Sequence, residues 1–150
     1  MSPIGSFDKE AELVAYCGLY CRTCDYFTGK LVEAARQALE VIERHGELKI
    51  FAEETGAFDY EELLRGLRWI ARELGPCVGA CRGGGGWGDC PVRRCCIERG
   101  VRFCYECDEF PCAAIKQLRG CEERLREIRR IGLEAWIKRQ LGLPVEGGEP

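Results

Sequence analysis

Apolar residues recur every three or four positions in two stretches of the chain, residues 28–46 and 59–76, and this spacing predicts two helices. The first stretch ends at Gly46, a residue type common just after a helix. The second begins at Asp59, whose carboxylate can cap a first turn, and it stops at Gly75. The predicted buried stripes are Leu31, Ala35, Leu39 and Ile42 in the first helix, and Leu63, Leu67, Ile70 and Leu74 in the second.

The same spacing predicts a last helix over about residues 121–141. Residues 47–58, which connect the first two helices, are compatible with either a short helix or a loop. The inward-facing positions of the last helix are predicted to be Leu125, Ile128, Trp136 and Ile137.

Residues 77–111 lack helical spacing and predict mainly turns. The segment CRGGGGWGDCP, residues 81–91, cannot form a regular element. Its four consecutive glycines are not a phosphate loop, because no strand precedes them and no Gly-Lys-Ser/Thr follows. We expect instead that they let the backbone fold tightly around a metal or another chain segment. The predicted fold class is therefore mainly α, a small helical domain with an irregular, cysteine-rich turn region.

At 150 residues the chain has the length of one domain. We predict a single domain over residues 1–143 and a disordered tail over residues 144–150. The formal net charge of −3 argues against nucleic acid, and no apolar stretch is long enough to span a membrane. The first residues lack the basic and apolar regions of a secretory signal, so a cytoplasmic location is expected. The sequence is compatible with an unknown protein partner.

Twelve cysteines are the strongest signal in the composition. In a reducing cytoplasm such thiols are expected to be metal ligands rather than disulfides, with intracellular proteins of hyperthermophiles as the exception. Two C-x-x-C pairs, Cys21/Cys24 and Cys104/Cys107, can each direct two sulfurs at one ion from a single tight turn, as in structural zinc sites. The candidate metal ligands are Cys17, Cys21, Cys24, Cys77, Cys81, Cys90, Cys95, Cys96, Cys104, Cys107 and Cys112.

These thiols suffice for about two tetrahedral sites. One site is expected to join Cys17, Cys21 and Cys24 to a distant thiol such as Cys112. The other is expected to draw on Cys81, Cys90, Cys95, Cys104 and Cys107. Metal bonds of this kind would staple the turn region, which has little apolar material of its own.

All-thiolate ligation suits zinc and iron–sulfur clusters. The two C-x-x-C turns, called knuckles below, favour Zn²⁺ slightly. The C-x3-C-x2-C spacing at residues 17–24, in contrast, is the one with which radical-SAM enzymes bind a 4Fe–4S cluster. The chain has neither the length nor the alternating strands of those enzymes, and no acid–base or nucleophilic constellation is evident. A non-enzyme is therefore favoured. The prediction is a metal-binding interaction or regulatory module, with a 4Fe–4S redox or electron-transfer protein and a metal-trafficking protein as alternatives.

Five arginines lie between the cysteines of the second cluster and are either charge partners of anionic metal–thiolate groups or a solvated surface. They are Arg82, Arg93, Arg94, Arg99 and Arg102. The remaining thiol, Cys121, is interpreted as a small buried hydrophobe at the start of the last helix.

Two segments together, YCGLYCRTCDYF and CRGGGGWGDCPVRRCCIERGVRFCYECDEFPC, resemble the cysteine-rich bacterial and archaeal family called domain of unknown function 3795. The resemblance covers roughly residues 15–131. The resemblance implies metal binding, and no reaction is established for the family as a whole. Members often have C-x-x-C where this chain has three residues between Cys77 and Cys81. Cys96 matches a double-cysteine subset, and Cys121 matches nothing in the pattern. The thiols that the resemblance maps onto the family's shared cysteines are Cys17, Cys21, Cys24, Cys81, Cys90, Cys95, Cys104, Cys107 and Cys112.

Overall fold

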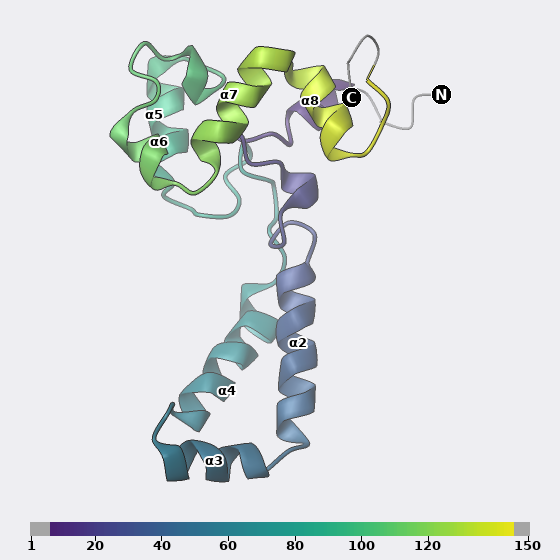
Figure 1. Ribbon diagram of the computed structural model, residues 1–150, viewed down its shortest axis with the longest axis vertical. Coiled ribbons are helices and arrows are strands. Elements are labelled where there is room, and N and C mark those ends of the chain that lie inside the picture. Colours follow the sequence, from purple (N-terminus) through teal and green to yellow (C-terminus); the bar gives the residue numbers. More distant parts are fainter. Residues whose placement is uncertain (1–6, 146–150) are drawn as a thin grey trace. The chain divides into compact units, whose positions relative to one another are not determined.

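The computed structural model describes residues 7–145, and this part of the chain is built from helices and turns without a strand (Figure 1). An isolated antiparallel bridge joins Val14 and Tyr20. The α-helices are α1 (Phe7–Ala11), α2 (Lys30–Glu43), α3 (Glu47–Thr55), α4 (Tyr60–Trp69), α5 (Pro91–Arg99), α6 (Ala113–Gln117), α7 (Cys121–Ile131) and α8 (Leu133–Gln140). Short 3-10 turns, η1 (Cys21–Thr23) and η3 (Cys104–Glu106), and a π-helical turn, η2 (Ile70–Leu74), complete the set. The predicted mainly-α class is confirmed.

Contacts divide the chain into two compact units. The cysteine unit comprises Met1–Cys24 and Gly79–Pro150, and the hairpin unit comprises Asp25–Val78. The single domain predicted over residues 1–143 stays a prediction, and of the predicted tail, residues 146–150 lie outside the described range. None of the helices within residues 7–145 has the length and apolar character that a membrane span needs.

The hairpin unit follows the predicted helices closely, with α2 beside α4 in Figure 1. Asp59 caps α4, because its side chain accepts a hydrogen bond from the Glu62 amide at 2.9 Å, as predicted. Residues 47–58 contain the helix α3 rather than only a loop. The prediction for Gly46 was wrong: α2 ends at Glu43, and Gly46 has a right-handed helical conformation in front of α3. The fully buried side chains of the unit are Ala35, Leu39, Ala52 and Leu64, while the other predicted stripe positions are half-buried.

Two predictions for the cysteine unit need correction. The single helix predicted over residues 121–141 is two helices, α7 and α8, because Gly132 between them has φ 87° and ψ 151°, a conformation outside the helical region. The turn region 77–111 contains a helix, α5, which begins with Pro91 at its first position and ends at Gly100 in the left-handed conformation. Both ends are common helix boundaries, so the signal was present in the sequence.

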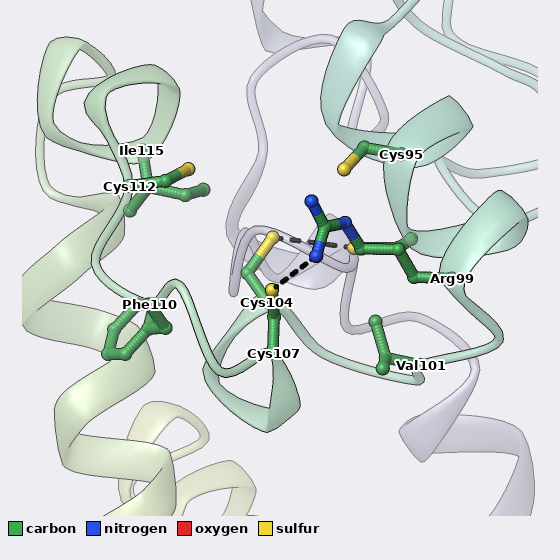
Figure 2. Close-up of a pocket in the computed structure, with 9 residues that line it drawn as sticks. Cys95, Arg99, Val101, Cys104, Cys107, Phe110, Cys112 and Ile115 are labelled. Atoms are coloured by element: carbon green, nitrogen blue, oxygen red, sulfur yellow. Dashed lines mark hydrogen bonds between the residues drawn. The ribbon is translucent and has the colours of Figure 1, made fainter.

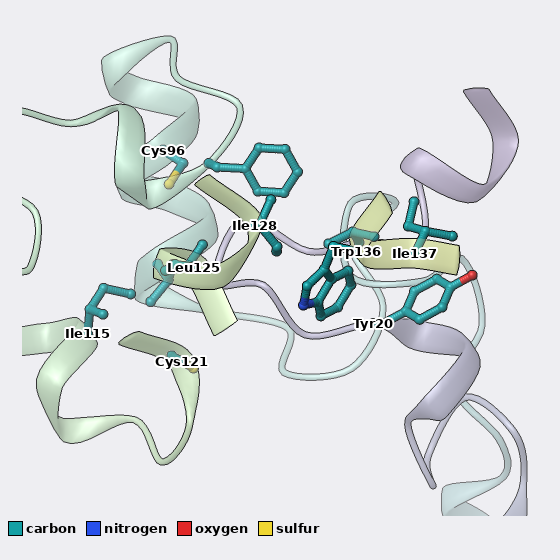
Figure 3. Packing of buried hydrophobic residues seen from close by; sticks show 11 residues of the cluster. Tyr20, Cys96, Ile115, Cys121, Leu125, Ile128, Trp136 and Ile137 are labelled. Atoms are coloured by element: carbon teal, nitrogen blue, oxygen red, sulfur yellow. The ribbon is translucent and has the colours of Figure 1, made fainter. Parts of the chain in front are cut away.

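The core of the cysteine unit joins α5, α7, α8 and the segment that follows α1 (Figure 3). All four positions predicted to face inward on the last helix are buried, which confirms that prediction. The Tyr20 ring meets the Trp136 ring edge to face, with centroids 5.9 Å apart and planes at 63°. The core cluster consists of Val14, Tyr20, Val92, Cys96, Phe103, Ile115, Cys121, Leu125, Ile128, Trp136 and Ile137.

Glu10 is the buried charged residue next to this core. The Tyr20 hydroxyl donates to its carboxylate at 2.5 Å, and the Arg22 guanidinium donates to it at 2.7 Å. The bond from Arg22 lowers the pKa of Glu10, and this effect exceeds the opposing effect of burial. Tyr20 is 1% exposed, so its hydroxyl depends on Glu10 for a partner.

We expect Glu10→Ala to lower the free energy of unfolding by about 1–3 kcal/mol at neutral pH, because it leaves the Tyr20 hydroxyl buried without its acceptor. The half-exposed Arg22 pair adds little to this value. Since the folded-state pKa of Glu10 is lowered, its ionisation stabilises the fold above the ordinary carboxyl pKa of about 4.3. That contribution disappears as the pH falls through the folded-state value. Urea titrations between acid and neutral pH should therefore show that the free energy of unfolding falls less on acidification in the variant than in the parent chain. Lys9→Ala, at an exposed position, is the control and should behave like the parent chain.

Candidate metal centre

Five cysteines line one pocket of the cysteine unit (Figure 2). The cavity has a volume of about 30 Å³, and its remaining lining is Arg99, Val101, Phe110 and Ile115. Three separate chain segments supply the thiols: helix α5, the turn around η3, and the residues just before α6. The five thiols are those of Cys95, Cys96, Cys104, Cys107 and Cys112.

Both C-x-x-C pairs adopt the same local turn. The Cys24 amide donates to the Cys21 carbonyl at 3.1 Å across η1, and the Cys107 amide donates to the Cys104 carbonyl at 3.1 Å across η3. A 3-10 turn of this kind closes with three residues per turn, so the first and fourth residues lie on the same side. Each C-x-x-C pair therefore contains the predicted tight turn, and the binding of both its sulfurs to one ion stays a prediction.

Several cysteine sulfurs meet in pairs, and two of these pairs join distant parts of the sequence. The Cys96 and Cys104 sulfurs lie 3.4 Å apart. Cys121 donates a hydrogen bond that lowers the pKa of Cys17 to about 6, and Cys81 lowers the pKa of Cys21 to about 6 in the same way. Two thiolates bound 2.3 Å from a tetrahedral zinc ion lie about 3.8 Å apart, close to the observed Cys96–Cys104 separation.

In the Cys96–Cys104 and Cys17–Cys121 pairs, the hydrogen bond between the two sulfurs shifts their pKa values in opposite directions. The hydrogen bond between Cys96 and Cys104 lowers the pKa of Cys96 and raises that of Cys104. The same arrangement raises the pKa of Cys121 as the donor to Cys17. A negative charge is thus stabilised on one sulfur of each pair, and a thiolate is the form in which cysteine binds metal.

Within residues 7–145, no three His, Cys, Asp or Glu side chains are arranged to hold one metal ion. All twelve cysteines are free thiols. The predicted ligand set therefore stays a prediction, and the structure shows how its members are distributed. Cys112, which was expected beside Cys17, Cys21 and Cys24, instead lines the pocket that contains Cys104.

Five predicted ligands lie outside the pocket lining and outside the Cys17–Cys121 pair. Cys21 and Cys81 contact each other, Cys24 ends the η1 turn, and the half-buried Cys90 precedes α5 and packs against the core. Cys77 belongs to the hairpin unit, where its amide donates to the Tyr26 carbonyl at 3.0 Å. The cysteine unit therefore contains every predicted ligand except Cys77.

Cys121 is the residue whose role was missed in the sequence. It is buried, as expected, but its sulfur also contacts Cys17 and accepts a hydrogen bond from Arg124 at 3.3 Å. More than a hundred positions separate Cys17 from Cys121, and no local spacing links them. Only the packing of α7 against the core brings the two together.

The arginines between the cysteines divide into two groups. Arg99 donates to the Cys107 sulfur at 3.2 Å, bonds to Cys95 and pairs with Glu109, so its guanidinium lies among the pocket thiols (Figure 2). It can offset the negative charge of a metal–thiolate group. The others serve the surrounding structure: Arg82 and Arg93 donate to backbone carbonyls, Arg94 pairs with Asp89, and Arg102 pairs with Glu12.

The glycine-rich segment folds against its own chain. At Gly83, a Cβ atom would come within 2.1 Å of the Gly79 carbonyl oxygen, so only glycine fits there. The tight approach is thus between residues four positions apart in the same loop, and folding of this segment around a metal stays a prediction. Arg93, on α5, holds this loop, because its guanidinium donates to four carbonyls, those of Cys81, Gly85, Trp87 and Gly88, at 2.8–3.1 Å.

We expect Arg93→Ala to lower the free energy of unfolding by roughly 1.5–3 kcal/mol, since the loop loses a charged donor shared by four carbonyls. Hydrogen exchange at residues 83–88 should accelerate as well. Arg94→Ala on the same helix removes an exposed ion pair to Asp89 and should change stability by less than about 1 kcal/mol. Equal effects of the two substitutions would contradict this role for Arg93.

The sequence profile of a family described as protein of unknown function (DUF3795) matches residues 13–117. The chain belongs to the DUF3795 family. The match includes all eleven predicted ligands and the whole pocket, whereas Cys121 lies beyond it. Searches of curated proteins and of solved structures gave no match to this DUF3795 protein.

Proposed function

We propose that this DUF3795 protein binds metal through cysteine thiolates in the pocket lined by Cys95, Cys96, Cys104, Cys107 and Cys112, and that the metal organises an interaction or regulatory module. The observation behind the proposal is that three separate segments bring five thiols to one small cavity. Four thiolates complete a structural zinc site, so the pocket offers enough ligands. The free state of all twelve cysteines agrees with a reducing compartment such as the cytoplasm.

Zn²⁺ is the favoured metal. The Cys104–Cys107 knuckle has the 3-10 turn expected for two ligands of one ion, and Arg99 places a positive charge beside them. The small cavity volume of about 30 Å³ suits a single ion. A second zinc site would use the thiols of Cys17 and Cys21, each of which already contacts a distant thiol.

The alternative is a 4Fe–4S protein that transfers electrons. It is supported by the C-x3-C-x2-C spacing at residues 17–24 and by the contacts of Cys17 and Cys21 with Cys121 and Cys81, which supply thiols from elsewhere in the sequence. The two proposals differ in colour, because iron–sulfur clusters absorb visible light and zinc thiolates do not.

Elemental analysis of the full chain, purified without oxygen, tests the proposal. We expect about one to two zinc ions per chain and a colourless solution. The double variant Cys104→Ser/Cys107→Ser should lose about one equivalent, whereas Cys77→Ser, in the hairpin unit, should keep the full amount. Stoichiometric iron with a brown colour would favour the alternative. A chain that contains neither metal, and binds neither when reconstituted under reducing conditions, would overturn both.

A further inference from the structure

Cys96 and Cys104 are held side by side by a short, well-defined connection. Cys96 lies on α5 and Cys104 begins η3, and the link between them is fixed by the hydrogen bond from the Val101 amide to the Cys96 carbonyl at 3.0 Å. The Cys104 amide donates to the Tyr16 carbonyl, also at 3.0 Å, which anchors the other side. The result is a separation of 3.4 Å between the two sulfurs.

Both sulfurs of this pair also line the pocket, which connects to the surface beside the exposed Cys95. A disulfide bond has a length of about 2.05 Å, so the two sulfurs need to approach by roughly 1.4 Å. A small oxidant that enters the pocket would therefore meet two thiols already placed for bond formation. The other two thiol pairs, Cys17–Cys121 and Cys21–Cys81, each contain a fully buried sulfur that does not line this pocket.

We propose that Cys96 and Cys104 are a redox-active pair that peroxides oxidise to a disulfide. One sulfur attacks the O–O bond of hydrogen peroxide, the bond breaks, a sulfenic acid forms and one water leaves. The second thiol then attacks the sulfenic sulfur, an S–S bond forms, the S–O bond breaks and a second water leaves with the remaining proton. Two thiols and one hydrogen peroxide thus give one disulfide and two waters.

Oxidation of this pair regulates the metal site, an inference that rests on the proposed function. Cys104 is the first residue of the Cys104–Cys107 knuckle, and a sulfur in a disulfide has lost the thiolate charge that binds metal. The disulfide therefore removes two of the five pocket thiols, which leaves fewer than the four that a structural zinc site needs, and the ion is released. Reduction of the bond restores the site, so the same pocket responds to the thiol–disulfide balance of its surroundings.

Peptide mapping of the reduced full chain as purified, without chelation, tests the pair, because its readout is a disulfide and not a metal. After brief treatment with hydrogen peroxide and alkylation of the remaining thiols, trypsin yields the peptides 95–99 and 103–116. We expect these to be the first peptides linked, with fragmentation placing the bond between Cys96 and Cys104. A first disulfide at another pair, or sulfinic and sulfonic acids in its place, would overturn the assignment.

The zinc-loaded chain tests the regulation. Zinc release, measured with a chromogenic chelator and divided by the zinc bound at the start, should follow disulfide formation with about one ion per disulfide, and thiol reductant should allow zinc to rebind. Cys96→Ser should suppress peroxide-driven release, and Cys77→Ser should match the parent chain. Zinc that stays bound after the Cys96–Cys104 bond has formed would refute the regulation. A chain that never binds metal would refute the proposed function while the mapping still decides the pair.

Discussion

Removal of the metal under reducing conditions should unfold residues 91–117 of the cysteine unit and leave the hairpin unit folded. The elements in this segment are α5, η3 and α6, of 9, 3 and 5 residues. Isolated helices shorter than about 12–15 residues are marginal in water, so these elements depend on what joins them. Structural zinc contributes an apparent binding free energy of about 10–16 kcal/mol in zinc-finger peptides, as large as the whole net stability of about 5–15 kcal/mol of a typical domain.

Hydrogen exchange measured on the full chain, before and after chelation, provides the comparison. Amides in residues 91–117 should lose nearly all protection, while those of α2, which packs with α4 in the hairpin unit, should keep theirs. The hairpin unit serves as the internal control because it contains none of the pocket thiols. Unchanged protection in residues 91–117, with elemental analysis proving that the metal is gone, would show that apolar packing alone orders this segment.

Long helices with a repeated apolar pattern were predictable from this sequence, whereas a short helix and a break inside a helix were not. The helices α2 and α4 were predictable because their apolar residues repeat over several turns. Helix α5 was missed because its buried positions, Val92 and Cys96, give a single repeat, and the cysteine was interpreted as a ligand rather than as core. The break at Gly132 was missed because an isolated glycine inside a periodic pattern is often accommodated, and only the packing of α7 with α8 requires its positive φ.

The candidate site shows the same division between local and tertiary information. Both C-x-x-C turns were predicted from spacing, because a 3-10 turn depends on neighbouring residues alone. The contacts Cys17–Cys121 and Cys21–Cys81 depend on how the two ends of the chain meet around the core. Spacing therefore predicted the local turns, whereas the neighbours of each thiol required the fold, and metal binding stays a prediction.

The largest effect of a single substitution is expected at Trp136, at the centre of the core (Figure 3). Its side chain is 0% exposed, its ring meets that of Tyr20, and its indole N–H donates to the Glu127 carboxylate at 3.2 Å. Trp136→Ala leaves a large cavity between α8 and the segment of Tyr20, and we expect it to lower the free energy of unfolding by about 3–5 kcal/mol. Such a loss is a large share of a net stability of about 5–15 kcal/mol.

Urea unfolding of the metal-loaded chain, followed by far-ultraviolet circular dichroism, measures this effect as a lower midpoint at an unchanged slope. Trp87→Ala is the matched control: this tryptophan is 62% exposed on the glycine-rich loop of the same unit, so its removal should change stability by less than about 0.5 kcal/mol. Trp136→Phe should lower the free energy of unfolding by an amount between those of the two alanine variants. It keeps an aromatic ring in the core, and the hydrogen bond that it loses goes to the partly exposed Glu127, whose carboxylate water can solvate instead. Equal midpoints for the Trp136 and Trp87 variants would mean that the core does not stabilise the cysteine unit, and that its order comes from the thiols alone.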